Sequence, residues 1–244
     1  MPRPPRFFIS PDQVIDQLIT ISGEDVRHIA AVLRMNTGDG LLLCDGTGTE
    51  YRTKIVQVGR AEIRAEIVSR SKREIRYPLI TLGQGLPKSD KMDWIVQKST
   101  ELGIATIIPL VTERTIVKIR DEEKRVSRWQ KIAREAAMQS NRPDIPQVGH
   151  IQSFSDFLRI LSPEHRTLLL LPWEEGIEPM KNILRQKPGI KNVFVLIGPE
   201  GGFSAQEAEA AKEKGFHLVT LGPNILRTET AAVAVLSMIG YEFL

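Results

Sequence analysis

The sequence contains very little cysteine and few histidines, which limits both cross-links and metal sites. Cys44 is the only cysteine among the 244 residues, so the chain has no internal disulfide framework and no cysteine-based zinc site. The four histidines, His28, His150, His165 and His217, are scattered without the short spacings of metal-binding motifs. We therefore expect no metal, and a chain without disulfides is typical of the cytoplasm.

Long apolar runs are also absent from the sequence. No uninterrupted run reaches the length of a membrane-spanning helix, so we expect no membrane partner. The first ten residues are basic but lack the apolar core and cleavage site of a signal peptide. A hydrophobic content of 41% and a charged content of 26% are those of an ordinary globular protein of one or two domains.

The N-terminal third of the chain has the pattern of a small β-rich domain. Short strand-like runs at 41–44, 54–58 and 61–68 are separated by glycine-containing turns, and the last run alternates apolar and charged residues. One short helix is expected at 24–33. Several short strands with frequent glycine turns indicate a small β-barrel, which we place at residues 1–73.

Strand-like and helix-like segments alternate in the remainder of the chain. The expected strands are 79–83, 104–110, 167–171, 193–197 and 217–221, and helices are expected between them and after the last one, at 231–241. Ser204 with Glu207 three residues later predicts a capping box at the start of one helix. Thr228 or Thr230 can cap the last helix, and its long apolar run predicts burial on most sides. This alternation predicts an α/β domain at residues 74–244, with a mainly parallel sheet covered on both faces.

Two glycine-rich loops near the C-terminus stand out as the place for a ligand. The sequence reads IGPEGGF at 197–203 and LGPNILRTETA at 221–231, and each loop follows a short apolar strand and leads into a helix. Such loops at the carboxyl ends of neighbouring strands are where an open α/β sheet binds its ligand. The first loop matches neither the P-loop nor the Rossmann dinucleotide motif.

Together the two loops resemble the cofactor motifs of the SPOUT-class RNA methyltransferases, and the whole chain resembles the RsmE family. Further matching segments read RFF at 6–8, KSDKMDWIVQKSTELG at 88–103, TER at 112–114 and REAAMQSNR at 134–142. The resemblance implies a trefoil-knotted SPOUT domain preceded by a PUA-like β-barrel, and a homodimer. It also implies methylation of N3 of a uridine in the 16S rRNA of the small ribosomal subunit.

The cofactor implied by the resemblance is S-adenosylmethionine. In the family the adenosine lies among backbone loops, and Ile225 and Leu226 would here supply apolar walls. The positions that match are Leu171, Pro172, Gly198, Glu200, Gly202, Leu221, Gly222, Ile225, Leu226 and Thr230.

The methyl acceptor sets a second chemical requirement, because uracil N3 carries a proton that must leave. This requires a general base, or cationic donors that stabilise the anion on O2 and O4. Arg227 is the candidate donor, and its alternative is a structural ion pair with Glu200 or Glu229. Glu229 is either a base or a carboxylate favoured at a helix start, and Glu200 has the same ambiguity.

Basic residues are concentrated upstream of the two loops. Nine Lys and Arg fall within 114–142, which suits either a polyanion or a solvated helix face balanced by nearby carboxylates. Beside a methyltransferase site, RNA is the better interpretation. The candidate RNA contacts are Arg6, His28, Arg34, Arg134 and Arg142.

The chain departs from the family pattern at two positions, Met138 and Asn141, where a glutamate and a glycine are usual. Asn tolerates a left-handed backbone, so the turn at Asn141 is expected to survive. Two rival functions remain: a SPOUT enzyme with another RNA target, and an RNA-binding or ribosome-assembly protein without catalysis.

Overall fold

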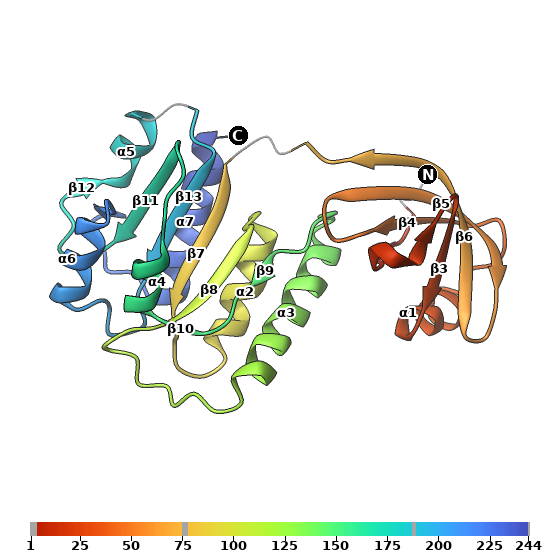
Figure 1. Ribbon diagram of the computed structural model, residues 1–244, viewed down its shortest axis with the longest axis horizontal. Coiled ribbons are helices and arrows are strands. Elements are labelled where there is room, and N and C mark those ends of the chain that lie inside the picture. The colour runs from red at the N-terminus through yellow and green to blue at the C-terminus, as the bar shows by residue number, and fades with distance from the viewer. Residues whose placement is uncertain (1–3, 75–77, 187–188, 244) are drawn as a thin grey trace. The chain divides into compact units, whose positions relative to one another are not determined.

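The computed structural model describes residues 4–74, 78–186 and 189–243 (Figure 1). The chain divides into two compact units. One comprises Met1–Glu74 with Ala137–Ile145, and the other comprises Ile75–Ala136 with Pro146–Leu244. The split into two contiguous domains, 1–73 and 74–244, therefore stays a prediction, since a short later segment groups with the first unit.

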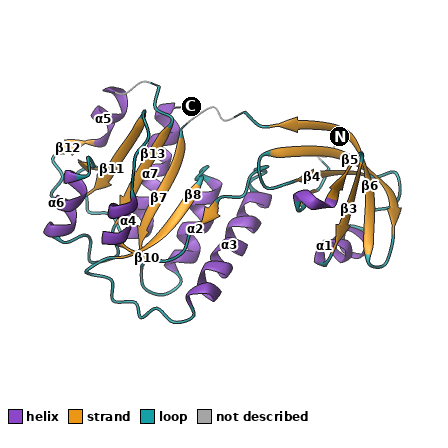
Figure 2. Ribbon diagram, in the orientation of Figure 1, coloured by secondary structure: helices purple, strands orange, loops and turns teal. Residues whose placement is uncertain are grey.

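The first unit is built on one six-stranded sheet (Figure 2). Its strands lie in the order β1-β4-β5-β6-β3-β2, and all neighbours are antiparallel except β1 and β4. The bounds are Arg6–Phe8 (β1), Val14–Ile15 (β2), Leu18–Ser22 (β3), Gly40–Cys44 (β4), Thr49–Val58 (β5) and Glu62–Lys72 (β6). Short helical segments are Pro11–Gln13, α1 (Glu24–Arg27) and a π-helical turn, His28–Val32, and the last two replace the single helix expected at 24–33.

The segment 137–145 packs on the first unit through apolar and backbone contacts. Ala137 joins a small buried cluster with Phe8 and Cys44, against which Met138 also packs. The Ile145 N–H donates to the Gly46 carbonyl at 3.0 Å. The two departures from the family pattern are thus accommodated, because Met138 is apolar and Asn141 adopts φ 59°, the left-handed conformation that Asn tolerates.

The second unit is built on an eight-stranded sheet in which all paired strands are parallel. The strand order is β10-β8-β7-β13-β11-β14-β12, with β9 beside β8. The bounds are Leu79–Gly85 (β7), Thr106–Val111 (β8), Gln147–Val148 (β9), Gln152–Ser153 (β10), Thr167–Pro172 (β11), Glu178–Pro179 (β12), Asn192–Ile197 (β13) and His217–Thr220 (β14). Ile197 lies opposite Gln84 and Pro172 opposite Val219, so four strands end at the same edge.

Helices cover both faces of this sheet (Figure 1). Alternate residues of β11 face different cores, since Leu168 and Leu170 belong to one buried cluster and Leu169 and Leu171 to another. The first core includes residues of α2 (Lys91–Glu101), α3 (Glu122–Gln139), α5 (Met180–Gln186) and α7 (Thr228–Phe243), and the second includes residues of α4 (Phe154–Ile160) and α6 (Ala205–Glu213). Burial on both faces explains why these strands are continuous apolar runs.

The last helix differs from its prediction in length and exposure. It begins at Thr228 instead of Ala231, and Thr230, Ser237, Met238 and Tyr241 are exposed. The long apolar run therefore does not make the helix buried on most sides. Within the described residues, no helix is long and apolar enough to cross a membrane.

Candidate functional site

A cavity of about 380 Å³ lies at the carboxyl edge of the parallel sheet. It is formed by the segments that follow β11, β13 and β14, together with the first turns of α2 and α7. Its walls combine apolar side chains, glycine backbone and four charged groups. The lining residues are Lys91, 172–174, 197–200, Gly202, Phe203, 220–228 and Ala231.

Most of the residues predicted to bind the cofactor line this cavity. Eight of the ten do so: Pro172, Gly198, Glu200, Gly202, Leu221, Gly222, Ile225 and Leu226. Leu171 is fully buried within β11, and Thr230 is exposed on α7, so neither is among the lining residues. Of the catalytic candidates, Arg227 and Glu200 line the cavity, whereas Glu229 lies next to it without lining it.

The loop after β13 closes tightly on itself. The Gly202 N–H donates to the Pro199 carbonyl at 2.9 Å, and Gly202 has φ 68°, a conformation that favours glycine. A Cβ at Gly198 would lie 2.9 Å from the backbone carbon of Gly202, so only glycine fits there without moving the loop. The Arg114 guanidinium donates to the Gly201 carbonyl at 2.8 Å, which ties the loop to the segment after β8.

The predicted capping box at the start of α6 is confirmed. The Ser204 N–H donates to the Glu207 carboxylate at 3.0 Å, and the Glu207 N–H donates to the Ser204 hydroxyl at 3.3 Å. The other oxygen of Glu207 accepts from the Glu113 N–H at 2.8 Å. The helix start is thereby tied to the segment after β8, which fixes the end of the first glycine-rich loop.

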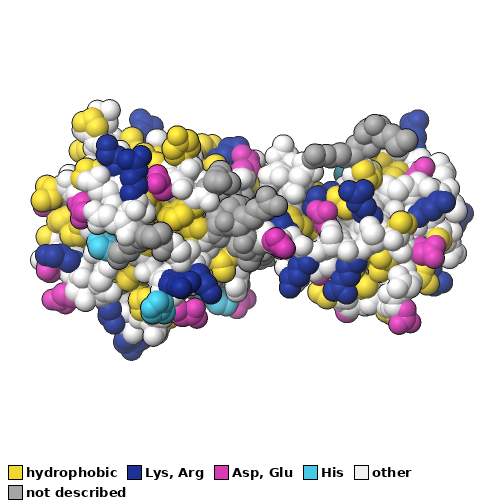
Figure 3. Space-filling model, turned by 90° about the horizontal axis from the view of Figure 1, so that it is seen from above, with side chains coloured by type: hydrophobic (Ala, Val, Ile, Leu, Met, Phe, Trp, Pro, Cys, Tyr) yellow, Lys and Arg dark blue, Asp and Glu magenta, His cyan; other side chains and the backbone are white. Residues whose placement is uncertain are grey.

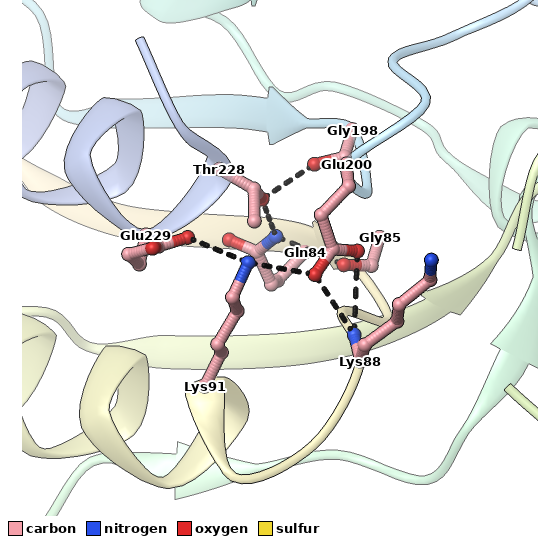
Figure 4. Close-up of polar contacts among 8 residues, drawn as sticks. All are labelled: Gln84, Gly85, Lys88, Lys91, Gly198, Glu200, Thr228 and Glu229. Atoms are coloured by element: carbon pink, nitrogen blue, oxygen red, sulfur yellow. Dashed lines mark hydrogen bonds and ion pairs between the residues drawn. The ribbon is translucent and has the colours of Figure 1, made fainter.

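A buried network centred on Thr228 joins three elements of the site (Figure 4). The Thr228 hydroxyl donates to the Gly198 carbonyl at 2.6 Å and accepts from Gln84 Nε2 at 2.9 Å. Gln84 is fully buried and also donates to the Gly85 carbonyl at 2.9 Å. Thr228 was expected, as an alternative to Thr230, to cap α7. Instead it is the first residue of the helix, and its side chain joins the two glycine-rich loops to β7.

We expect Thr228→Val to destabilise the protein by about 1–3 kcal/mol, because the half-buried Gly198 carbonyl and the buried Gln84 amide each lose a partner. Valine keeps the shape of threonine, so the loss reports on hydrogen bonding alone. Urea unfolding measures the difference, and Thr37→Val, at an exposed turn position, is the control. An unchanged unfolding free energy would show that the network contributes nothing to stability.

Two groups hold the Glu200 carboxylate at the cavity wall (Figure 4). The Lys91 ammonium donates to Oε1 at 2.8 Å, and the Lys88 N–H lies 3.1 and 3.3 Å from the two oxygens. Lys91 Nζ also lies 3.5 Å from Oε2 of Glu229, in the first turn of α7. One lysine on α2 therefore bridges the two carboxylates that the sequence offered as bases.

These contacts decide the charge of Glu200. Burial works to raise the pKa of its carboxyl, but hydrogen bonds from Lys91 and from backbone N–H groups outweigh burial and lower this pKa. The hydrogen bond with Glu200 in turn raises the pKa of Lys91. Glu200 is consequently a weak base, and the pair is charged at neutral pH.

The lowered pKa predicts an acid-dependent contribution to stability. A carboxyl with a depressed folded pKa stabilises the protein above the ordinary glutamate value of about 4.3, and this contribution is lost as the pH falls through the folded pKa. We expect the difference in unfolding free energy between the native protein and Glu200→Gln to shrink as the pH falls below about 4.3. Urea unfolding at several pH values measures it, and a difference independent of pH would contradict the assigned charge.

Arg227 is free to act on a ligand. Its side chain is exposed and lines the cavity, and within the described residues no ion pair or hydrogen bond of its guanidinium is present. The alternative of a structural ion pair with Glu200 or Glu229 is therefore wrong in this structure, because Lys91 pairs with both carboxylates.

The candidate RNA contacts differ in their surroundings. The Arg6 side chain is 10% exposed, donates to the Glu50 carboxylate at 2.7 Å and contacts Cys44 Sγ at 3.1 Å. Arg142 is 7% exposed and pairs with Asp144. His28, Arg34 and Arg134 are exposed. On the face seen in Figure 3, Lys and Arg side chains are interspersed with Asp and Glu.

Several residues of the site were not predicted from the sequence. Trp173 and Glu174 line the cavity just after β11, and Lys91, Gln84 and Arg114 hold its loops. Trp173 and Glu174 could have been found, because they follow Pro172 at the end of a predicted strand. The other three lie far from the loops in sequence. Lys91 and Arg114 fall in the family-matching segments 88–103 and 112–114, but no local pattern places any of the three beside the loops.

Family models match both parts of the chain. A model described as an RNA methyltransferase domain matches residues 73–240, and one described as an RNA methyltransferase PUA domain matches residues 21–68. The chain is 35% identical over 248 residues to ribosomal RNA small subunit methyltransferase E of Bacillus subtilis, covering 97% of this chain and 96% of that protein. It is 33% identical to the Synechocystis protein of the same name, covering 96% and 76%.

Solved structures with similar sequences share the fold. Ribosomal RNA small subunit methyltransferase E from Neisseria gonorrhoeae, bound to S-adenosyl methionine, superimposes with a TM-score of 0.86 at 32% identity over 98% of both chains. A putative methyltransferase from Legionella pneumophila, in complex with the same cofactor, gives a TM-score of 0.84 at 34% identity, again over 98% of both. These likenesses confirm the predicted fold class, a mainly parallel α/β methyltransferase domain preceded by a PUA-like domain.

Proposed function

The chain belongs to the ribosomal RNA small subunit methyltransferase E family, the RsmE family that its motifs resemble, and on this premise we propose that it methylates small-subunit rRNA. The methyl donor is S-adenosylmethionine, and the acceptor is N3 of a uridine in 16S rRNA. The observation that carries the proposal is the cavity formed by both glycine-rich motifs at the carboxyl edge of the sheet.

The cavity suits the proposed donor in size and chemistry. Its volume of about 380 Å³ falls in the range of small-molecule sites. Leu221, Ile225 and Leu226 supply apolar walls for an adenine ring, and the backbone of the two loops supplies donors and acceptors for its edge. Glu174 and Glu200 supply carboxylates that accept from hydroxyl or ammonium groups. S-adenosylmethionine, when bound, supplies a methyl group on a positively charged sulfur.

The protein's contribution to transfer is positioning and electrostatics. Arg227 orients the uracil and donates to O2 or O4, which stabilises the anion formed as the N3 proton passes to solvent water. Glu200 is held by Lys91 and the Lys88 N–H, so it acts as a charged acceptor instead of a base. Glu229, outside the cavity lining, contributes its charge beside the same lysine.

RNA and a second copy of the chain are the proposed partners. The exposed His28, Arg34 and Arg134 are better placed for RNA than Arg6 and Arg142, whose side chains are buried in ion pairs. The homodimer would cover the exposed apolar groups of α7, where Met238 is 39% and Tyr241 85% exposed. The work of the protein would then take place in the cytoplasm, where the small subunit is assembled.

Methyl transfer from labelled cofactor into purified small subunits lacking the modification tests the function. We expect a single N3-methyluridine when the product is mapped by mass spectrometry. Incorporation at another site or into another RNA would leave the fold assignment intact and show that the proposed substrate is wrong. Cofactor binding without incorporation into any ribosomal RNA would favour an RNA-binding or assembly protein.

A further inference from the structure

Lys91 lines the cavity and lies beside two carboxylates, those of Glu200 and Glu229. Its ammonium lies 2.8 Å from Glu200 and 3.5 Å from Glu229. Its side chain is about one-third exposed, at 32%, while those of Glu200 and Glu229 are 28% and 19% exposed. One oxygen of Glu229 is buried and has no hydrogen bond. The ion pair with Lys91 therefore offsets the cost of burying its negative charge.

Arg227 is the other cation that shares these surroundings. It lines the same cavity as Glu200 and precedes Glu229 by two residues, yet its guanidinium is unpaired within the part of the chain described. Arginine is the side chain best suited to bidentate pairing with carboxylates. An uncompensated carboxylate at either position would therefore attract Arg227 away from a ligand.

We propose that Lys91 is a positioning residue that keeps Arg227 available to the methyl acceptor by occupying both carboxylates. This inference rests on the proposed function and adds to it a residue on α2 to which no role was assigned. Lys91 does not touch the uracil. It acts through Arg227, because it removes the two partners that would otherwise hold the guanidinium in an ion pair.

A double-mutant cycle tests the inference. We expect Lys91→Met to lower the rate constant of methyl transfer by about 10²-fold, the loss typical of removing one transition-state donor. Arg227→Ala in the Lys91→Met background should then add no more than about 2-fold, since the arginine is already withdrawn. Lys91→Arg should retain activity, and Lys91→Met with Glu229→Gln should recover part of it, because one competing charge is gone.

Lys98→Met is the matched control. Lys98 lies on the same helix, makes an ion pair of the same 2.8 Å length with Glu101, and has a similar exposure of 34%. Its loss should leave methyl transfer unchanged. Additive effects of Lys91→Met and Arg227→Ala, or failure of Glu229→Gln to restore any activity to Lys91→Met, would overturn the inference.

A structure of Lys91→Met separates this inference from the proposed function. We expect the Arg227 guanidinium within 4 Å of a Glu200 or Glu229 carboxylate oxygen, the ordinary limit of an ion pair. An Arg227 side chain that stays unpaired would overturn the inference even in an active enzyme. If the native protein transfers no methyl group to small subunits, the proposed function fails, while the structure of the variant still decides the role of Lys91.

Discussion

Arg227→Ala is expected to lower the rate constant of methyl transfer by about 10²–10³-fold and to leave the affinity for S-adenosylmethionine nearly unchanged. The guanidinium lines the cavity and has no partner of its own among the described residues. Its removal therefore costs the donor that we propose stabilises the uracil anion, without leaving a buried charge behind. Single-turnover methyl transfer and calorimetric titration of the cofactor measure the two quantities separately.

Arg159→Ala is the control for this variant. Arg159 lies on α4 in the same unit, its side chain is 76% exposed, and it pairs with Asp156; neither residue lines the cavity. It should leave both rate and affinity unchanged. Equal losses of cofactor affinity and rate in Arg227→Ala would instead assign the arginine to cofactor binding.

Gly198→Ala is expected to weaken S-adenosylmethionine binding by about 10²-fold or more, the penalty of misplacing a site by roughly 1 Å. The added methyl group would lie 2.9 Å from the backbone carbon of Gly202 and 3.2 Å from the Phe203 nitrogen. Both neighbours are backbone, so the loop itself must open, and the Gly198 carbonyl would shift from Thr228. Isothermal titration with the cofactor measures the loss.

Gly149→Ala is the matched control. A Cβ at Gly149 would make only ordinary contacts, the nearest at 3.7 Å, and the residue does not line the cavity. It should bind the cofactor as the native protein does. Native affinity in Gly198→Ala, with an intact circular dichroism spectrum, would show that the loop tolerates opening and that its tight closure is unrelated to binding.

The sequence predicted the parts of the site that local patterns encode. Glycine-rich turns after apolar runs located both loops, and Ser204 with Glu207 located the start of α6. Contacts between distant segments could not be predicted in this way. Lys91 and Glu200 are separated by 109 positions, and Gln84 and Thr228 by 144. Their meeting depends on which strands are neighbours in the sheet, which periodicity does not determine.

The start of α7 shows how tertiary contacts change a local prediction. Threonine is a favoured cap, so the pattern placed Thr228 or Thr230 before the helix. The Thr228 hydroxyl is instead used by Gly198 and Gln84, and the helix extends back to include it. The trefoil knot, by contrast, is implied by the family alone and stays a prediction.

The return of residues 137–145 to the first unit has a consequence for the order of synthesis. Phe8 and Cys44 are buried together with Ala137, and Gly46 bonds to Ile145. A ribosome synthesises the chain from its N-terminus. Phe8 and Cys44 therefore lack their packing partner from 137–145 until at least 145 residues have emerged. A fragment that ends at residue 74 would expose the same apolar side chains to water, so the first unit cannot be separated intact by a single cut.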